Sequence, residues 1–162
     1  MIEVVVAHLG LDRTTNTPVV ILREKDGERV LPIWIGPAEA SAIAMEIQSV
    51  KAARPMTHDL LKQIVVGLGA QLRRVVIHDV KDNTYFAELL MSREDYLFQV
   101  DARPSDSIAL ALRLDAPIFA NEHLLDQRTV ETPEPNESSL DAEKLKQYLE
   151  KMDPQDFGKF TP

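Results

Sequence analysis

Apolar positions in the first third of the chain follow the period of a strand and then the period of a helix. Strands rich in Val and Ile are predicted at residues 2–9, 18–24 and 29–35. Residues 25–28, between the last two strands, are typical of a hairpin turn. From residue 38 to 51 apolar side chains recur at helical spacing, and Pro37 stands where a helix start tolerates proline.

The next part of the chain predicts a helix and then a similar series. Thr57 is a favourable cap for this helix, whose predicted buried face is Leu60, Leu61, Ile64 and Val65. Three further strands are predicted at residues 72–80, 84–91 and 97–101. A helix that opens at Ser105 or Asp106 follows, and then a short strand at 117–120 and a helical turn at Leu124 and Leu125.

Two stretches of the sequence repeat at a spacing of 67 residues. The repeat places residues 30–33 on 97–100, 37–39 on 104–106, and 43–44 on 110–111. We therefore predict an α+β fold, with a single domain of two related β-β-β-α halves that arose by duplication. Such a domain would have two equivalent strand-to-helix corners.

The amino-acid composition of the chain changes after Gln127. Residues 1–127 are expected to form the domain, and residues 128–139 read as an acidic, proline-rich linker. Residues 140–162 are predicted to form a C-terminal helix and tail, with one apolar stripe on the helix. This helix is expected to dock on its own domain or on a second subunit.

Composition narrows the possible functions. The 162 residues are 44% hydrophobic, which suits one domain with a core. There is no cysteine, so disulfides and thiolate metal sites are excluded. A net charge of -8 argues against a broad basic surface for nucleic acid. The absence of a leader or a long apolar run predicts a soluble, cytoplasmic protein with no membrane partner.

Two polar clusters interrupt the apolar pattern, at residues 54–59 and 101–107. Each cluster has an arginine directly before a proline, and a carboxylate just inside a predicted helix start. If the fold brings the clusters together, they form a site.

These clusters also carry a family resemblance. The motifs that carry the resemblance are residues 31–36 (LPIWIG), Glu39, 54–60 (RPMTHDL) and 101–111 (DARPSDSIALA). They occur in the order typical of the bifunctional nuclease domain family, which the chain resembles over roughly residues 1–127. The resemblance implies an α+β domain, often found as a homo-oligomer, and nuclease activity on both RNA and DNA.

A metal-assisted nuclease needs carboxylates that converge on Mg²⁺ or Mn²⁺, because these ions prefer oxygen ligands and activate water. The candidate ligands are Glu39, Asp59, Asp101 and Asp106. Asp59 and Asp106 lie in first helical turns, so each is equally well interpreted as a helix cap or a partner of the helix dipole.

The basic side chains of the two clusters have candidate roles in the same reaction. Arg54 and Arg103 can clamp a phosphate, although Arg103 can instead form an internal ion pair with its neighbouring aspartates. His58 is the candidate general base, and the alternative is an ordinary surface histidine. Trp34 is interpreted as a core or interface residue.

The main alternative function is a binding or regulatory module without catalysis, which recognises a protein or a small anion. The acidic net charge favours this alternative.

Overall fold

Two three-stranded meanders form most of the sheet in the computed structural model, which describes residues 1–125. The first meander contains β1 (Ile2–Leu11), β2 (Pro18–Glu24) and β3 (Val30–Trp34). The second contains β4 (Ala70–Lys81), β5 (Thr84–Arg93) and β6 (Tyr96–Ala102). The short strand β7 (Ile118–Ala120) joins them, and the strand order is β3-β2-β1-β7-β4-β5-β6.

The two halves have the same element order, as the sequence repeat predicts. Helix α1 (Pro37–Ile47) follows β3, and helix α3 (Pro104–Leu114) follows β6, 67 residues later at both of its ends. Strand β7 is antiparallel to β1 and parallel to β4, so β1 and β4 run in opposite directions. The halves are therefore arranged as if related by a half turn about an axis through the middle of the sheet.

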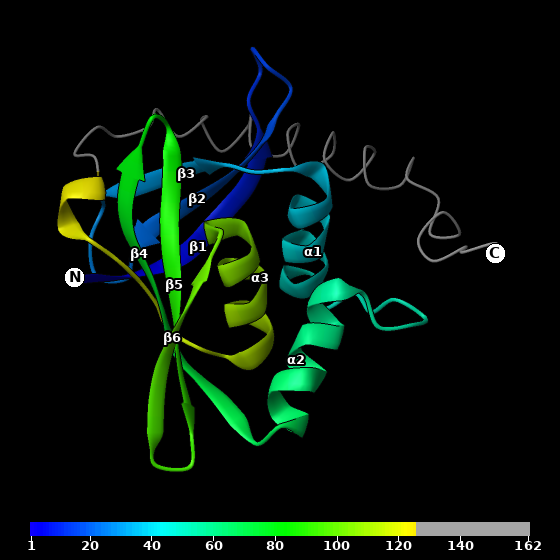
Figure 1. Cartoon of the computed structure of the whole chain (residues 1–162). Coiled ribbons are helices and arrows are strands. Elements are labelled where there is room, and N and C mark those ends of the chain that lie inside the picture. The colour runs from blue at the N-terminus through cyan, green and yellow to red at the C-terminus, as the bar shows by residue number, and fades with distance from the viewer. Residues whose placement is uncertain (126–162) are drawn as a thin grey trace. The chain divides into compact units, whose positions relative to one another are not determined.

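Three helices cover one face of the sheet, and Figure 1 shows α3 nearest the strands, alongside both α1 and α2 (Thr57–Gly67). Helix α3 is the most deeply buried, and residues 108–111 (IALA) are at most 1% exposed. Its apolar side chains pack on strand residues such as Val75 and Ile77. The α+β fold class is thus confirmed, with its core between the sheet and α3.

The predicted burial of α2 is confirmed for Val65 and wrong for the other three residues of the predicted face. Its buried residues are His58 and Val65, whereas Leu60, Leu61 and Ile64 are exposed. The apolar spacing correctly indicates a helix, but within residues 1–125 α2 packs mainly on α3 and β4, and most of its apolar stripe is exposed. Helix α1 also ends at Ile47, so the predicted continuation to residue 51 is wrong.

The turn predicted at the end of the domain is the 3₁₀ helix η1 (Glu122–Leu124). The predicted linker at 128–139 and the predicted helix at 140–162 lie outside the described residues. Within residues 1–125, none of the helices is long and apolar enough to cross a membrane.

Candidate functional site

The two equivalent strand-to-helix corners start α1 and α3. Each helix begins with a proline, preceded by an extended residue, Gly36 or Arg103. This local structure follows from the sequence, because proline suits the first helical position and keeps the preceding residue out of the helical region. Neither helix start has a side-chain cap, so both present unpaired backbone N–H groups.

Arg103 connects the two corners. Its Nε donates to Asp106 Oδ2 at 2.7 Å, and its Nη2 donates to Glu39 Oε1 of α1 at 2.7 Å. These hydrogen bonds raise the pKa of the Arg103 guanidinium, which remains charged. The side chain is nevertheless 66% exposed, and Nη1 takes part in neither ion pair. The internal ion pair with Asp106 is thus confirmed.

His58 adds the third helix to this arrangement. Its Nε2 lies 2.9 Å from Asp106 Oδ1, and the residue is only 8% exposed. Burial raises the pKa of Asp106, but the hydrogen bonds from Arg103 and His58 outweigh burial and hold that pKa below its usual value. We call Glu39, Arg103, Asp106 and His58 the corner network. It links α1, α3 and α2, and it contradicts both the cap interpretation of Asp106 and the surface interpretation of His58.

Asp59 belongs to a separate, more buried pair. Its Oδ1 accepts from Arg113 Nε at 2.7 Å, and its Oδ2 accepts from the Met56 backbone N–H at 3.0 Å. The Arg113 side chain is 3% exposed and also donates to the carbonyls of Ala42 and Ala109. Burial raises the pKa of Asp59, but its hydrogen bonds to Arg113 and Met56 outweigh burial and hold that pKa below its usual value. The cap interpretation of Asp59 is confirmed, whereas Thr57 is not the cap.

The other two predicted site residues lie outside the corner network. Asp101 is exposed on β6, opposite Glu88 of β5. Arg54 is exposed in the segment before α2. Within residues 1–125, no three His, Asp or Glu side chains come together in a group that could hold a metal ion. The four predicted ligands are therefore not a preformed metal centre in this arrangement.

A pocket of about 330 Å³ opens beside Arg103. Its walls come from the β1–β2 loop, the end of β3 and the two residues after it, the β4–β5 turn with the start of β5, and the start of α3. Trp34 lines it, is 52% exposed, and donates from Nε1 to Asp12 Oδ2 at 2.9 Å. The assignment of Trp34 to the core is therefore wrong. Its position two residues before Gly36, at the strand-to-helix corner, is the sequence signal that places it beside the site.

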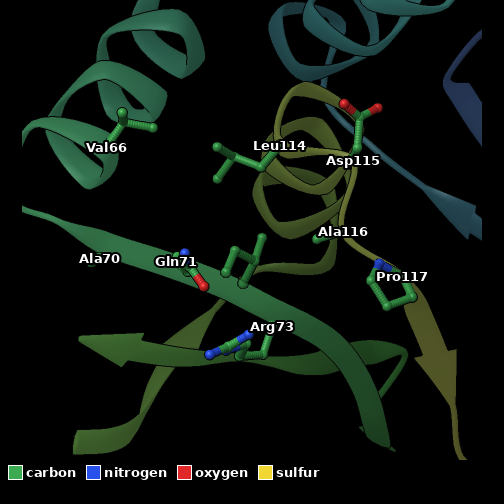
Figure 2. Close-up of a pocket in the computed structure, with 9 residues that line it drawn as sticks. Val66, Ala70, Gln71, Arg73, Leu114, Asp115, Ala116 and Pro117 are labelled. Atoms are coloured by element: carbon green, nitrogen blue, oxygen red, sulfur yellow. The ribbon is translucent and has the colours of Figure 1, made fainter. Parts of the chain in front are cut away.

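A second pocket, of about 370 Å³, lies at the other ends of α2 and α3 (Figure 2). It is lined by apolar residues such as Val66 and Leu114, together with Arg73 and Asp115. Figure 2 shows the Asp115 carboxylate directed away from Arg73, whose Nε donates to Ser92 Oγ at 2.8 Å. None of the predicted site residues lines this pocket.

The fold and the corner network define an α+β domain with an exposed arginine fixed between two helix starts. The model of the bifunctional nuclease domain family matches residues 20–133, and the chain belongs to this family. An uncharacterised protein of Mycobacterium tuberculosis is 40% identical, over 96% of this chain and 97% of its own length.

Plant proteins named as bifunctional nucleases are more distant. Bifunctional nuclease 1 of Arabidopsis thaliana is 27% identical over 76% of this chain, and bifunctional nuclease 2 of Oryza sativa subsp. japonica is 29% identical over 82%. The matched region is 42% of each plant protein, so this chain spans under half of their length.

Proposed function

We propose that the chain hydrolyses phosphodiester bonds of RNA, DNA or both at the corner network. The observation that carries the proposal is the position of Arg103, whose exposed guanidinium lies between two uncapped helix starts. Positive charge and free N–H groups at one point suit a phosphate. Membership of the bifunctional nuclease family supports the same substrate class.

Each member of the corner network has a proposed role. Arg103 holds the phosphate through Nη1, because Nε and Nη2 are already bound to Asp106 and Glu39. A neutral His58 donates Nε2–H to Asp106, which leaves the lone pair on Nδ1 to accept a proton from the attacking water. The water oxygen bonds to phosphorus, the ester P–O bond breaks, and the leaving oxygen takes a proton from solvent.

No step is assigned to a metal ion, since no group of three suitable side chains is assembled among residues 1–125. Dependence on Mg²⁺ or Mn²⁺ is a separate prediction, and the assay below tests it by adding either ion or EDTA. Asp101 and Arg54 have no role in the proposed reaction, because they lie outside the corner network.

A non-catalytic binding module is the second candidate, and the charge balance of the network favours it. Two carboxylates, Glu39 and Asp106, face one guanidinium, so with a neutral His58 the network carries one net negative charge. This excess charge weakens phosphate binding. In this alternative the network fastens three helices together, and a neighbouring surface recognises a protein or a small anion.

The test compares cleavage of single-stranded and duplex RNA and DNA by the wild type, Asp106→Asn and Asp115→Asn, each with Mg²⁺, Mn²⁺ or EDTA. Asp115 is a matched control, because it is exposed at the far end of α3, where asparagine also tolerates its left-handed backbone. Because Asp106 orients His58, the proposed base, we expect Asp106→Asn to cut roughly 100-fold more slowly, the lower bound for loss of general base catalysis. If a folded Asp106→Asn variant and the wild type cut at equal rates, hydrolysis at the corner network is contradicted and the binding module remains as the candidate function.

We further propose that the protein forms a homo-oligomer and acts in the cytoplasm. Strand β6 is an edge of the sheet, and its residues Tyr96, Leu97, Phe98 and Val100 are exposed. An exposed edge with apolar side chains is a typical surface for pairing with a second copy of the chain.

A further inference from the structure

We propose that the pocket beside Arg103 binds one unpaired base of a single-stranded nucleic acid, with the base against Trp34 and the adjoining phosphate at Arg103. This inference rests on the proposed function and specifies its substrate. It assigns the substrate contact to a pocket that none of the predicted catalytic residues lines.

The aromatic wall of the pocket suits a base. The volume of about 330 Å³ lies within the range of small-molecule sites. Trp34 is half exposed, and its bond to Asp12 holds the indole in place without using the face of the ring. Bases stack on such fixed aromatic rings with little dependence on sequence, because every base has a π-face. Tyr85, on the β5 side of the pocket, adds a second aromatic residue.

Polar side chains line the same pocket. Ser105 is only 7% exposed and lines the pocket, and its hydroxyl forms no hydrogen bond with residues 1–125. This hydroxyl can therefore donate to, or accept from, a ligand in the pocket. Asn83 and Thr84, in the β4–β5 turn, supply further donors and acceptors for the edge of a base.

The phosphate position lies on the Arg103 side of the pocket. Nη1 of Arg103 is not used by either carboxylate, and the adjacent start of α3 is uncapped. A phosphate here meets a guanidinium and the positive end of a helix together. These contacts offset the excess negative charge that Glu39 and Asp106 leave in the corner network.

A duplex does not fit this arrangement. Bases within a duplex are stacked on their neighbours, so neither face is free to lie on Trp34. An unpaired base can turn out of its strand and present one face to an aromatic side chain. The pocket therefore selects single strands and ends over duplex.

The experiment uses the full chain, in which Trp34 is the only tryptophan, so intrinsic fluorescence reports directly on the pocket. A ten-nucleotide single strand of thymidine is titrated, and its duplex with adenosine strands serves as the comparison. We expect saturable quenching by the single strand and at least tenfold weaker binding of the duplex. Quenching that is absent, or equal for both, overturns the inference.

Variants test the contacts with a fluorescein-labelled strand followed by anisotropy. Trp34→Ala is expected to weaken binding roughly five- to 150-fold, the range for loss of one stacked base. Ser105→Ala should weaken binding by a smaller factor, and Leu68→Ala, exposed at the end of α2, is the control that should bind as the wild type does. Unchanged binding by Trp34→Ala contradicts the inference even where the strand binds elsewhere.

The same samples are run on a gel after titration, which separates the two proposals. Binding that depends on Trp34 but leaves the strand intact supports the pocket and contradicts hydrolysis. Cleavage without binding that depends on Trp34 supports hydrolysis and contradicts the pocket.

Discussion

Replacing Asp59 by asparagine should destabilise the domain because it removes the nearer of the two carboxylates that face the buried Arg113 guanidinium. The Arg113 side chain is 3% exposed, and its bond to Asp59 is 2.7 Å long. Breaking a buried ion pair from one side costs about 3–5 kcal/mol. Arg113 keeps the carbonyls of Ala42 and Ala109, and Glu46 Oε2 lies 4.0 Å from its Nε, so we expect a loss near the lower end, about 3 kcal/mol.

Urea unfolding followed by circular dichroism measures this loss directly, and thermal unfolding should show a melting temperature roughly 6–12 °C lower. The matched control is Asp79→Asn, since Asp79 pairs at 3.3 Å with the exposed Lys81. An exposed pair of this kind contributes at most about 1 kcal/mol. If Asp59→Asn and Asp79→Asn lose the same stability, Arg113 does not depend on Asp59, and the reasoning is refuted.

Two further predictions concern pH and self-association. The pKa of Asp59 is held below its unfolded value, so its contribution to stability is present above about pH 4 and is lost as the pH falls through the lower, folded pKa. The urea midpoint, measured at pH 7, 4 and 3, should therefore fall more steeply with falling pH for the wild type than for Asp59→Asn. Parallel curves would contradict this linkage. Leu97→Asp places a charge on the exposed β6 edge, and the mass measured by light scattering should fall to that of one chain while stability is unchanged. Glu94→Asp, at an exposed position in the β5–β6 turn, is the control, and a monomeric wild type would contradict the proposed homo-oligomer.

The order of the elements could be predicted from the sequence because it depends on local patterns. Alternating Val and Ile residues, the 67-residue repeat and Pro37 and Pro104 define two β-β-β-α halves. The burial of α2 could not be predicted, since an apolar stripe shows which residues share a helix face and not what covers that face. Leu60, Leu61 and Ile64 are exposed for this reason.

The site was predictable only in part for a related reason. Arg103 and Asp106 are three residues apart, so their ion pair follows from helical spacing. His58 and Asp106 are 48 residues apart, and Asp59 and Arg113 are 54 apart. Which of two adjacent residues meets which helix depends on how α2 crosses α3, and no local pattern in the sequence specifies that crossing. Arg113 was therefore missed.

The central position of β7 has a consequence for how the chain folds. Strands β1 and β4 do not pair with each other, and three residues, Ile118–Ala120, bond to both. Each meander is closed by short turns and needs only local contacts, whereas Ile2 meets Ala120 from the opposite end of the domain. Closing so long a loop is slow relative to hairpin formation. During synthesis the first meander can thus assemble early, while the continuous sheet waits until residue 120 has left the ribosome.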